Sequence, residues 1–223
     1  MIEARSLSTR AGSFALHDVS FVVPKRAWGA VTGPVGAGKT TLLETIAGIR
    51  RVTRGIVLLR DVPVTDLPPE GRRLGIVYQR GFLFPHLSVA ANVAYGAADP
   101  GYAAEIGRRF GVDKLHDRRV AELSGGERQA VALARALATK PDVVLLDEPF
   151  SALDQARWAR VRKELCTLYR EQGLTILQVT HDPAEMEAAD VRVELEDGRV
   201  VRWSGESGES ATRVSEPGLR PAG

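Results

Sequence analysis

The chain has 223 residues, 44% of them hydrophobic, and its 30 basic and 28 acidic side chains leave a net charge of +2, which gives no support to a nucleic-acid partner. A single cysteine, Cys166, excludes an internal disulfide framework and fits a reducing compartment. No apolar run reaches the about 18–20 residues that span a bilayer, and the first ten residues lack the apolar core of a signal peptide, so we expect a cytoplasmic chain.

Alternating apolar residues predict short strands over residues 14–23 and 27–32, with a turn at PKR between them. The second strand runs into the glycine-rich segment GPVGAGKTT, and a helix is expected from Lys39 to Ala47, with Gly48 as its stop. Further along, GIVLLRDVPV predicts a strand, a turn and a strand. LGIVYQ predicts a buried strand that ends at Gln79.

Residues 81–122 are expected to be mostly helical, interrupted at ADPG. VVLLD at 143–147 and TILQVTH at 175–181 are typical of central parallel strands. The alternation of strands and helices predicts an α/β domain over residues 1–203, with a helical insertion over about residues 80–135. Residues 204–223 are rich in Gly, Ser and Pro and predict a disordered tail.

The first segment with clear chemistry, residues 33–40, fits the pattern G-x-x-x-x-G-K-[ST]. Its glycines allow backbone N–H groups to curl around phosphate oxygens, and the following helix adds its positive N-terminal end. Lys39 is expected to reach β- and γ-phosphates, and the Thr40 hydroxyl to ligate Mg²⁺. The predicted phosphate site comprises Gly33, Pro34, Val35, Gly36, Ala37, Gly38, Lys39 and Thr40.

An acidic pair ends the strand at 143–147. Asp147 is the expected magnesium ligand, and Glu148 is the candidate general base for hydrolysis. Two solvated acids at a strand end are the alternative interpretation. Gln79 and His181 also end predicted strands, and both could reach a γ-phosphate from the same sheet edge, although a histidine at a strand end is more often structural. The other histidines, at positions 17, 86 and 116, have no such setting.

A second glycine pair opens a helical pattern in LSGGERQAVALARAL, residues 123–137. Glycines at a helix start often allow close approach to an anion. A helix cap without chemistry is the alternative. The order of motifs, from phosphate loop through glutamine, LSGGE, Asp–Glu and SALD to histidine, resembles the ATPase subunit of an ATP-binding cassette (ABC) transporter over about residues 1–203.

This resemblance implies a P-loop NTPase fold with a mostly parallel central sheet, an N-terminal antiparallel β-subdomain and a helical insertion subdomain. It implies ATP and Mg²⁺ as cofactors, and two cassettes that meet head to tail as a homodimer. Each ATP would lie between one chain's phosphate loop and the other chain's LSGGE. By position, the resemblance implies that Ser124, Gly125 and Gly126 contact the γ-phosphate bound by the partner chain, and that Asp154 lies at the dimer seam. It implies that Gln79 senses Mg²⁺ and the permease, and that His181 is the switch histidine. Thr41 would add a contact to the α-phosphate.

One position departs from the family, which usually stacks an aromatic residue, commonly tyrosine, on adenine ahead of the phosphate loop. No tyrosine precedes residue 78 in this chain. Phe14 is the candidate for this role, and Phe21 and Trp28 fit the core better.

The segment LPPEGRRLGIVYQRGFLFPHLSVAANVAYG resembles importer ATPases, especially those for molybdate, tungstate or sulfate. The implied partners are transmembrane permease subunits and, indirectly, an extracytoplasmic solute-binding protein, at the cytoplasmic face of the membrane. A permease helix would pack on Phe82, Leu83, Phe84 and Leu87, which could instead be core residues. A non-transport ABC ATPase of DNA repair, chromosome structure or translation, and an exporter subunit, are the alternative functions.

Overall fold

The computed structural model describes residues 1–97 and 99–205, and the predicted tail beyond residue 205 lies outside them. An antiparallel sheet forms one layer of the fold, with the strand order β2-β1-β4-β5. Its strands are β1 (Ile2–Ala11), β2 (Phe14–Val23), β4 (Val52–Leu59) and β5 (Val62–Pro63). This sheet is the antiparallel β-subdomain that the resemblance implies.

A second, central sheet has the strand order β10-β9-β3-β8-β7-β6. All of its neighbouring pairs are parallel except β9 and β10. The prediction of a mostly parallel sheet, with VVLLD and TILQV at its centre, is therefore confirmed. Its strands are β3 (Trp28–Thr32), β6 (Gly75–Val77), β7 (Val143–Asp147), β8 (Thr175–Val179), β9 (Val191–Glu196) and β10 (Arg199–Ser204).

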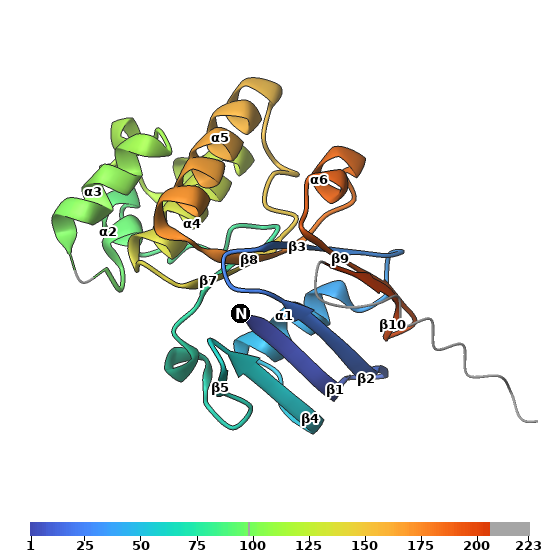
Figure 1. The fold of residues 1–223 in the computed structure, drawn as a ribbon. Coiled ribbons are helices and arrows are strands. Elements are labelled where there is room, and N and C mark those ends of the chain that lie inside the picture. Colours follow the sequence, from blue (N-terminus) through green and yellow to red (C-terminus); the bar gives the residue numbers. More distant parts are fainter. Residues whose placement is uncertain (98, 206–223) are drawn as a thin grey trace, which may run out of the picture.

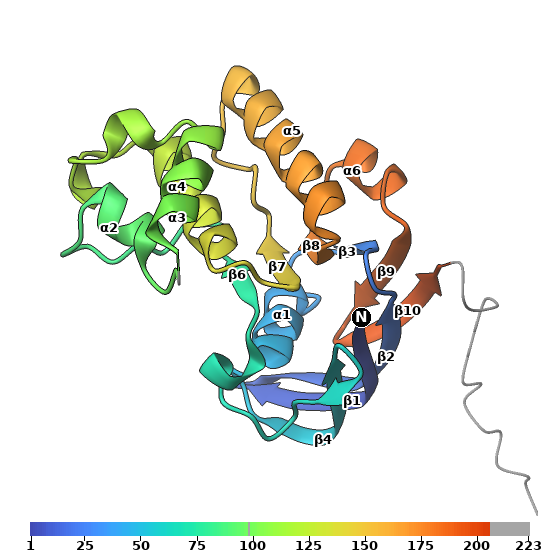
Figure 2. The same ribbon diagram turned by 60° about the vertical axis from the view of Figure 1, so that its left-hand side comes forward.

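Helix α1 (Lys39–Ala47) lies between the two sheets and was correctly predicted at both ends (Figure 1). Helices α4, α5 and α6 lie on the opposite face of the central sheet, and α2 and α3 pack against α4 at one end of this layer (Figure 2). These helices are α2 (Val89–Ala94), α3 (Pro100–Arg109), α4 (Gly125–Ala138), α5 (Gln155–Gln172) and α6 (Pro183–Glu187). In the part of the chain that the structure describes, no helix is long and apolar enough to cross a membrane.

The region 81–122 is less helical than the sequence predicts. Between α2 and α4, the described residues contain only α3 and the short 3₁₀ turns Asp113–Leu115 and Val120–Glu122. The predicted interruption is present, because α2 ends at Ala94 and α3 begins only at Pro100. Asp99 caps α3 by accepting hydrogen bonds from the backbone of Gly101 and Tyr102, and Pro100 occupies the first turn.

A buried guanidinium joins α1 to the β-subdomain side of the molecule. Arg72 is 2% exposed, and it donates to the carbonyl oxygens of Thr45 and Ile46 in the last turn of α1. It also donates to the carbonyl oxygens of Thr65 and Leu67 in the loop after β5. These bonds add to the partners of the last-turn carbonyl groups, of which that of Thr45 also accepts from Gly48 N, and a cation suits the negative end of the helix dipole.

Candidate active site

The phosphate loop connects β3 to α1 and contains three glycines with left-handed backbone. Gly33, Gly36 and Gly38 have φ values of 137°, 85° and 99°. A Cβ atom at Gly33 would lie 2.0 Å from the Leu195 carbonyl oxygen, so only glycine fits there. The Lys39 ammonium donates to the carbonyl oxygens of Gly33 and Pro34, at 2.7 and 2.8 Å, and therefore lies across the loop. The residues Pro34, Val35 and Gly36 are exposed and form the rim of the phosphate loop.

Thr40 and Asp147 meet at the start of α1. The Thr40 hydroxyl donates to Asp147 Oδ2 at 2.7 Å. Asp147 ends β7 and is only 7% exposed. Burial raises the pKa of Asp147 above its ordinary value, the Thr40 hydrogen bond opposes this, and the nearby Glu148 charge adds to the rise.

This pair fits a magnesium ion. A hydroxyl and a carboxylate are oxygen ligands of the kind that Mg²⁺ takes in proteins, usually together with phosphate oxygens and water. Within residues 1–97 and 99–205, no group of three or more His, Cys, Asp and Glu side chains could hold a metal by itself. A protein-only cage is therefore absent from the described part, and the donor set is one that a nucleotide's phosphates would complete.

Glu148 lies beside Asp147 but faces a different set of partners. Its φ of 44° turns the chain sharply, and its backbone N–H donates to the Val179 carbonyl of β8. Its carboxylate accepts a 2.7 Å hydrogen bond from Gln79 Nε2 and lies 3.6 Å from His181 Nδ1. The structure therefore brings Gln79, Glu148 and His181 together at the carboxyl edge of the central sheet, as the sequence predicts.

The second glycine pair lies at the N-terminus of α4. Ser124 caps this helix by accepting a hydrogen bond from Glu127 N, and the Glu127 carboxylate accepts one in return from Ser124 N. The latter bond is the main cause that lowers the pKa of Glu127 below its ordinary value. Ser124 and Gly125 are exposed, whereas Gly126 is buried, and a Cβ there would make a tight contact of 3.1 Å with the Ala152 carbonyl oxygen.

The two glycine-rich segments are separate within one chain. Among the described residues, no hydrogen bond or ion pair joins the segment 124–126 to the loop 33–41. Instead, the helix cap at Ser124 borders the SALD segment, where Asp154 caps α5 by accepting from Arg157 N. Sequence reasoning missed Arg157, whose Nη1 donates to Ser124 Oγ at 3.4 Å and whose Nη2 lies 3.9 Å from Glu127. No sequence motif marks this residue.

Phe14 lies against the phosphate loop. A Cβ at Gly38 would lie 2.6 Å from the edge of the Phe14 ring, so the ring packs directly on the loop backbone. Phe21 is buried in the core, as expected, and Trp28 is half-buried against Tyr169, with a ring-centroid distance of 5.3 Å. Phe14 is therefore the aromatic residue of the three that reaches the loop.

The apolar segment 82–87 forms an aromatic surface next to Gln79. Phe82 is 62% exposed, whereas Leu83, Phe84 and Leu87 are half-buried. The Phe84 ring lies 4.3 Å from the Tyr95 ring, and the Arg135 guanidinium lies over it at 4.9 Å. Sequence reasoning missed the residue that supports this surface, Asn92, which is fully buried and bonds the Phe84 N–H and carbonyl.

Comparisons with known proteins give a consistent result. Residues 16–151 match the family model described as ABC transporter. The chain is 43% identical to the molybdate/tungstate import ATP-binding protein WtpC of Archaeoglobus fulgidus, over 94% of this chain and 92% of that protein. It is 42% identical to the spermidine/putrescine import ATP-binding protein PotA of Pseudomonas fluorescens over 82% of this chain, but spans only 55% of that relative's length. A dimeric ATP-binding cassette bound to ADP and Pi superposes with a TM-score of 0.83 at 27% identity, over 94% of this chain and 100% of the other.

Proposed function

Because the chain belongs to the ABC transporter family, we propose that it is the ATP-hydrolysing subunit of an importer for an oxyanion such as molybdate or tungstate. The chain is an ATPase of this family. The observation that supports the substrate class is the likeness to WtpC along nearly the whole length of both proteins. Relatives named for spermidine or Fe³⁺ import match at similar identity, so the importer class is supported more strongly than the oxyanion.

The proposed hydrolysis takes place at the carboxyl edge of the central sheet. Backbone N–H groups of the loop 33–41 and the Lys39 ammonium bind the phosphates, with Thr41 at the α-phosphate. Thr40 and Asp147, with Gln79 nearby, would hold a Mg²⁺ ion, which would supply positive charge to offset the charge of the phosphates. Glu148 accepts a proton from the attacking water.

The in-trans role of LSGGE rests on the separation of the two glycine-rich segments. Ser124 and Gly125 are exposed at the N-terminus of a 14-residue helix, where free N–H groups and the helix dipole favour an anion. We propose that this anion is the γ-phosphate bound by a second copy of the chain, with Asp154 at the seam. The solved dimeric cassettes of similar fold support this arrangement.

The proposed permease site combines the aromatic surface 82–87 with an apolar groove whose lining begins at Val89, two positions after Leu87. The groove has a volume of about 360 Å³ and lies between α2 and α3, where its apolar walls include Val89, Val93 and Ala103. A short apolar helix of a membrane permease is the proposed occupant. Gln79 begins the segment that leads to this surface, so it connects the permease site to Glu148. The chain would then be held at the cytoplasmic face of the membrane, with an extracytoplasmic solute-binding protein acting through the permease.

The test is purification of the tagged chain from its native membranes in mild detergent, followed by reconstitution of the co-purifying permease in liposomes. ATP hydrolysis is measured with the solute-binding protein loaded in turn with molybdate, tungstate, spermidine or Fe³⁺. Stimulation by the two oxyanions alone is expected. Stimulation by spermidine or Fe³⁺ instead would contradict the substrate class, and the absence of any permease would contradict the importer role.

A further inference from the structure

The turn that carries His181 is closed by a hydrogen bond between the residues on either side of the histidine. After β8 ends at Val179, the Thr180 hydroxyl accepts a hydrogen bond from Asp182 N at 3.1 Å, which closes the turn around His181. The His181 side chain itself is 77% exposed and lies 3.6 Å from Glu148. Its position therefore depends on the backbone that holds it, because little else packs against the ring.

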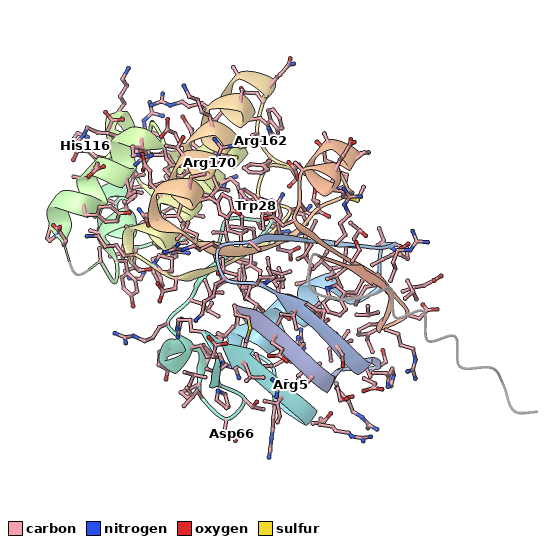
Figure 3. The ribbon with its side chains drawn as sticks, in the orientation of Figure 1. Arg5, Trp28, Asp66, His116, Arg162 and Arg170 are labelled. Atoms are coloured by element: carbon pink, nitrogen blue, oxygen red, sulfur yellow. The ribbon has the colours of Figure 1, made fainter. Side chains whose placement is uncertain are left out.

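Glu185 of α6 fixes this turn from behind. Its Oε2 accepts a 2.5 Å hydrogen bond from the Thr180 hydroxyl and a 2.6 Å hydrogen bond from Gln178 Nε2. Gln178 is 1% exposed, and its Oε1 accepts from the Trp28 indole N–H at 3.0 Å. Trp28 lies between α5 and the central sheet (Figure 3), so this chain of hydrogen bonds anchors the His181 turn in the interior.

The Glu185 side chain also lines two cavities. Glu185 lines a cavity of about 160 Å³ on the catalytic side, together with Glu148 and His181. It lines a second cavity of about 340 Å³ behind that one, together with Trp28, Arg162 and Gln178. Burial raises the pKa of Glu185, and of the charged groups that face it, Asp182 adds to the rise while Arg162 on α5 opposes it. Partial burial of an acid costs folding free energy, and the hydrogen bonds of this half-buried carboxylate go to the His181 turn and to Gln178.

We propose that Glu185 is a positioning residue for His181, which holds the histidine at Glu148 through Thr180 during ATP hydrolysis. The inference rests on the role proposed above for His181 in this reaction. Both Glu185 and Thr180 line the cavity beside Glu148, but among the described residues neither forms a hydrogen bond or ion pair with the phosphate loop 33–41, Asp147 or Glu148. Their loss should therefore change the rate of hydrolysis and leave the affinity for ATP intact.

The experiment compares single-turnover hydrolysis and ATP affinity for Glu185→Ala, Glu185→Gln and Thr180→Val. We expect Glu185→Ala and Thr180→Val each to lower the rate by at least about tenfold, and by up to about 10²-fold, the scale of a 1 Å misplacement of a catalytic group. Glu185→Gln should keep most of the activity, because its amide oxygen can still accept both hydrogen bonds. Glu187→Ala, on the exposed side of the same helix, is the matched control and should leave the rate unchanged.

A double-mutant cycle with His181→Ala distinguishes the two proposals. If Glu185 acts through the histidine, Glu185→Ala should slow the wild-type background and have no further effect on the His181→Ala background. Equal effects on both backgrounds would overturn the positioning role of Glu185 while leaving the proposed function intact. A wild-type rate in His181→Ala would overturn the role of the histidine itself. Thr180→Val gives the same cycle should Glu185→Ala fail to fold.

Discussion

The Thr40 hydroxyl donates a 2.7 Å hydrogen bond to the Asp147 carboxylate, although 107 positions separate the two residues in the sequence. The bond joins the first turn of α1 to the end of β7. It therefore aligns the phosphate loop with the acidic strand end through contacts of the chain itself. The buried acid of this pair is also the basis of the first prediction.

Asp147→Asn should stabilise the magnesium- and nucleotide-free protein. Burial raises the pKa of Asp147 above its ordinary 3.8, so the ionised form destabilises the fold, and this cost is present at neutral pH and disappears as the pH falls through the raised value. The amide carries no such cost. Near neutral pH we expect a Tm higher by about 2–4 °C, which corresponds to roughly 1 kcal/mol for a chain of this size.

Thermal melts from neutral pH down to about pH 4.5 check this, because the advantage of the asparagine should shrink as Asp147 takes up its proton. Asp66→Asn, at an exposed position, is the matched control. An advantage that does not depend on pH would show that the gain has another cause than the buried charge.

Glu148→Gln should keep ATP binding and lower hydrolysis by at least about 10²-fold, the scale expected for the loss of a general base. The glutamine can retain the contact with Gln79 but cannot take a proton from water. Single-turnover hydrolysis and nucleotide titration are the measurements, with Glu196→Gln on the exposed face of β9 as control. A near-normal rate would place the base elsewhere.

Ser124→Arg on the Glu148→Gln background should abolish ATP-induced dimers while labelled nucleotide still binds the monomer. The arginine fills the proposed γ-phosphate slot at the start of α4, and each lost charge-assisted hydrogen bond is worth about 1.5–3 kcal/mol at two symmetric sites. Gel filtration with and without ATP reports the dimer. Ser88→Ala removes a similar cap from α2 and should have no effect on it. Undiminished dimers in the double variant would contradict the in-trans role.

Phe84→Ala and Leu87→Ala should weaken association with the permease more than they lower the ATPase rate of the isolated subunit. The structure supports adding Phe82→Ala, because this ring is the most exposed of the segment. Pull-down with the permease is the measurement. Val62→Ala, which alters a 53% exposed side chain on the β-subdomain, is the control. Equal capture of all variants would favour the core interpretation of these residues.

Phe14→Ala should raise the Kd for ATP about tenfold, within the range expected for loss of one aromatic–base stack, and leave the rate at saturating ATP unchanged. Phe14→Tyr, which keeps a ring on Gly38, should bind as the wild type does. Fluorescent-nucleotide titration distinguishes the variants. If Phe14→Ala binds ATP normally, the adenine is stacked elsewhere.

The sequence predicts the motif-bearing elements well because each combines a short apolar strand with a polar residue at its end, as at Asp147 and Gln79. It does not predict β1. That strand has irregular pairing between Ala4 and Leu7 and again between Leu7 and Thr9, and Ser6 has a φ of 46°. These irregularities break the alternation of buried and exposed side chains by which a strand is recognised.

The supporting residues are also invisible in the sequence. Arg72, Asn92, Arg157 and Glu185 are polar residues in segments without a motif, and their partners are distant loops or helix ends. Their roles depend on tertiary contacts that no local pattern encodes. The chemical groups could therefore be located from the sequence, whereas the contacts that hold them could not.

Arg72 has a mechanical consequence for the phosphate loop. Helix α1 is bonded to Asp147 at its first turn and to the Arg72 guanidinium at its last, and the same guanidinium bonds the loop that follows β5. A force applied to the loop by a bound phosphate is therefore transmitted along α1 to the antiparallel sheet.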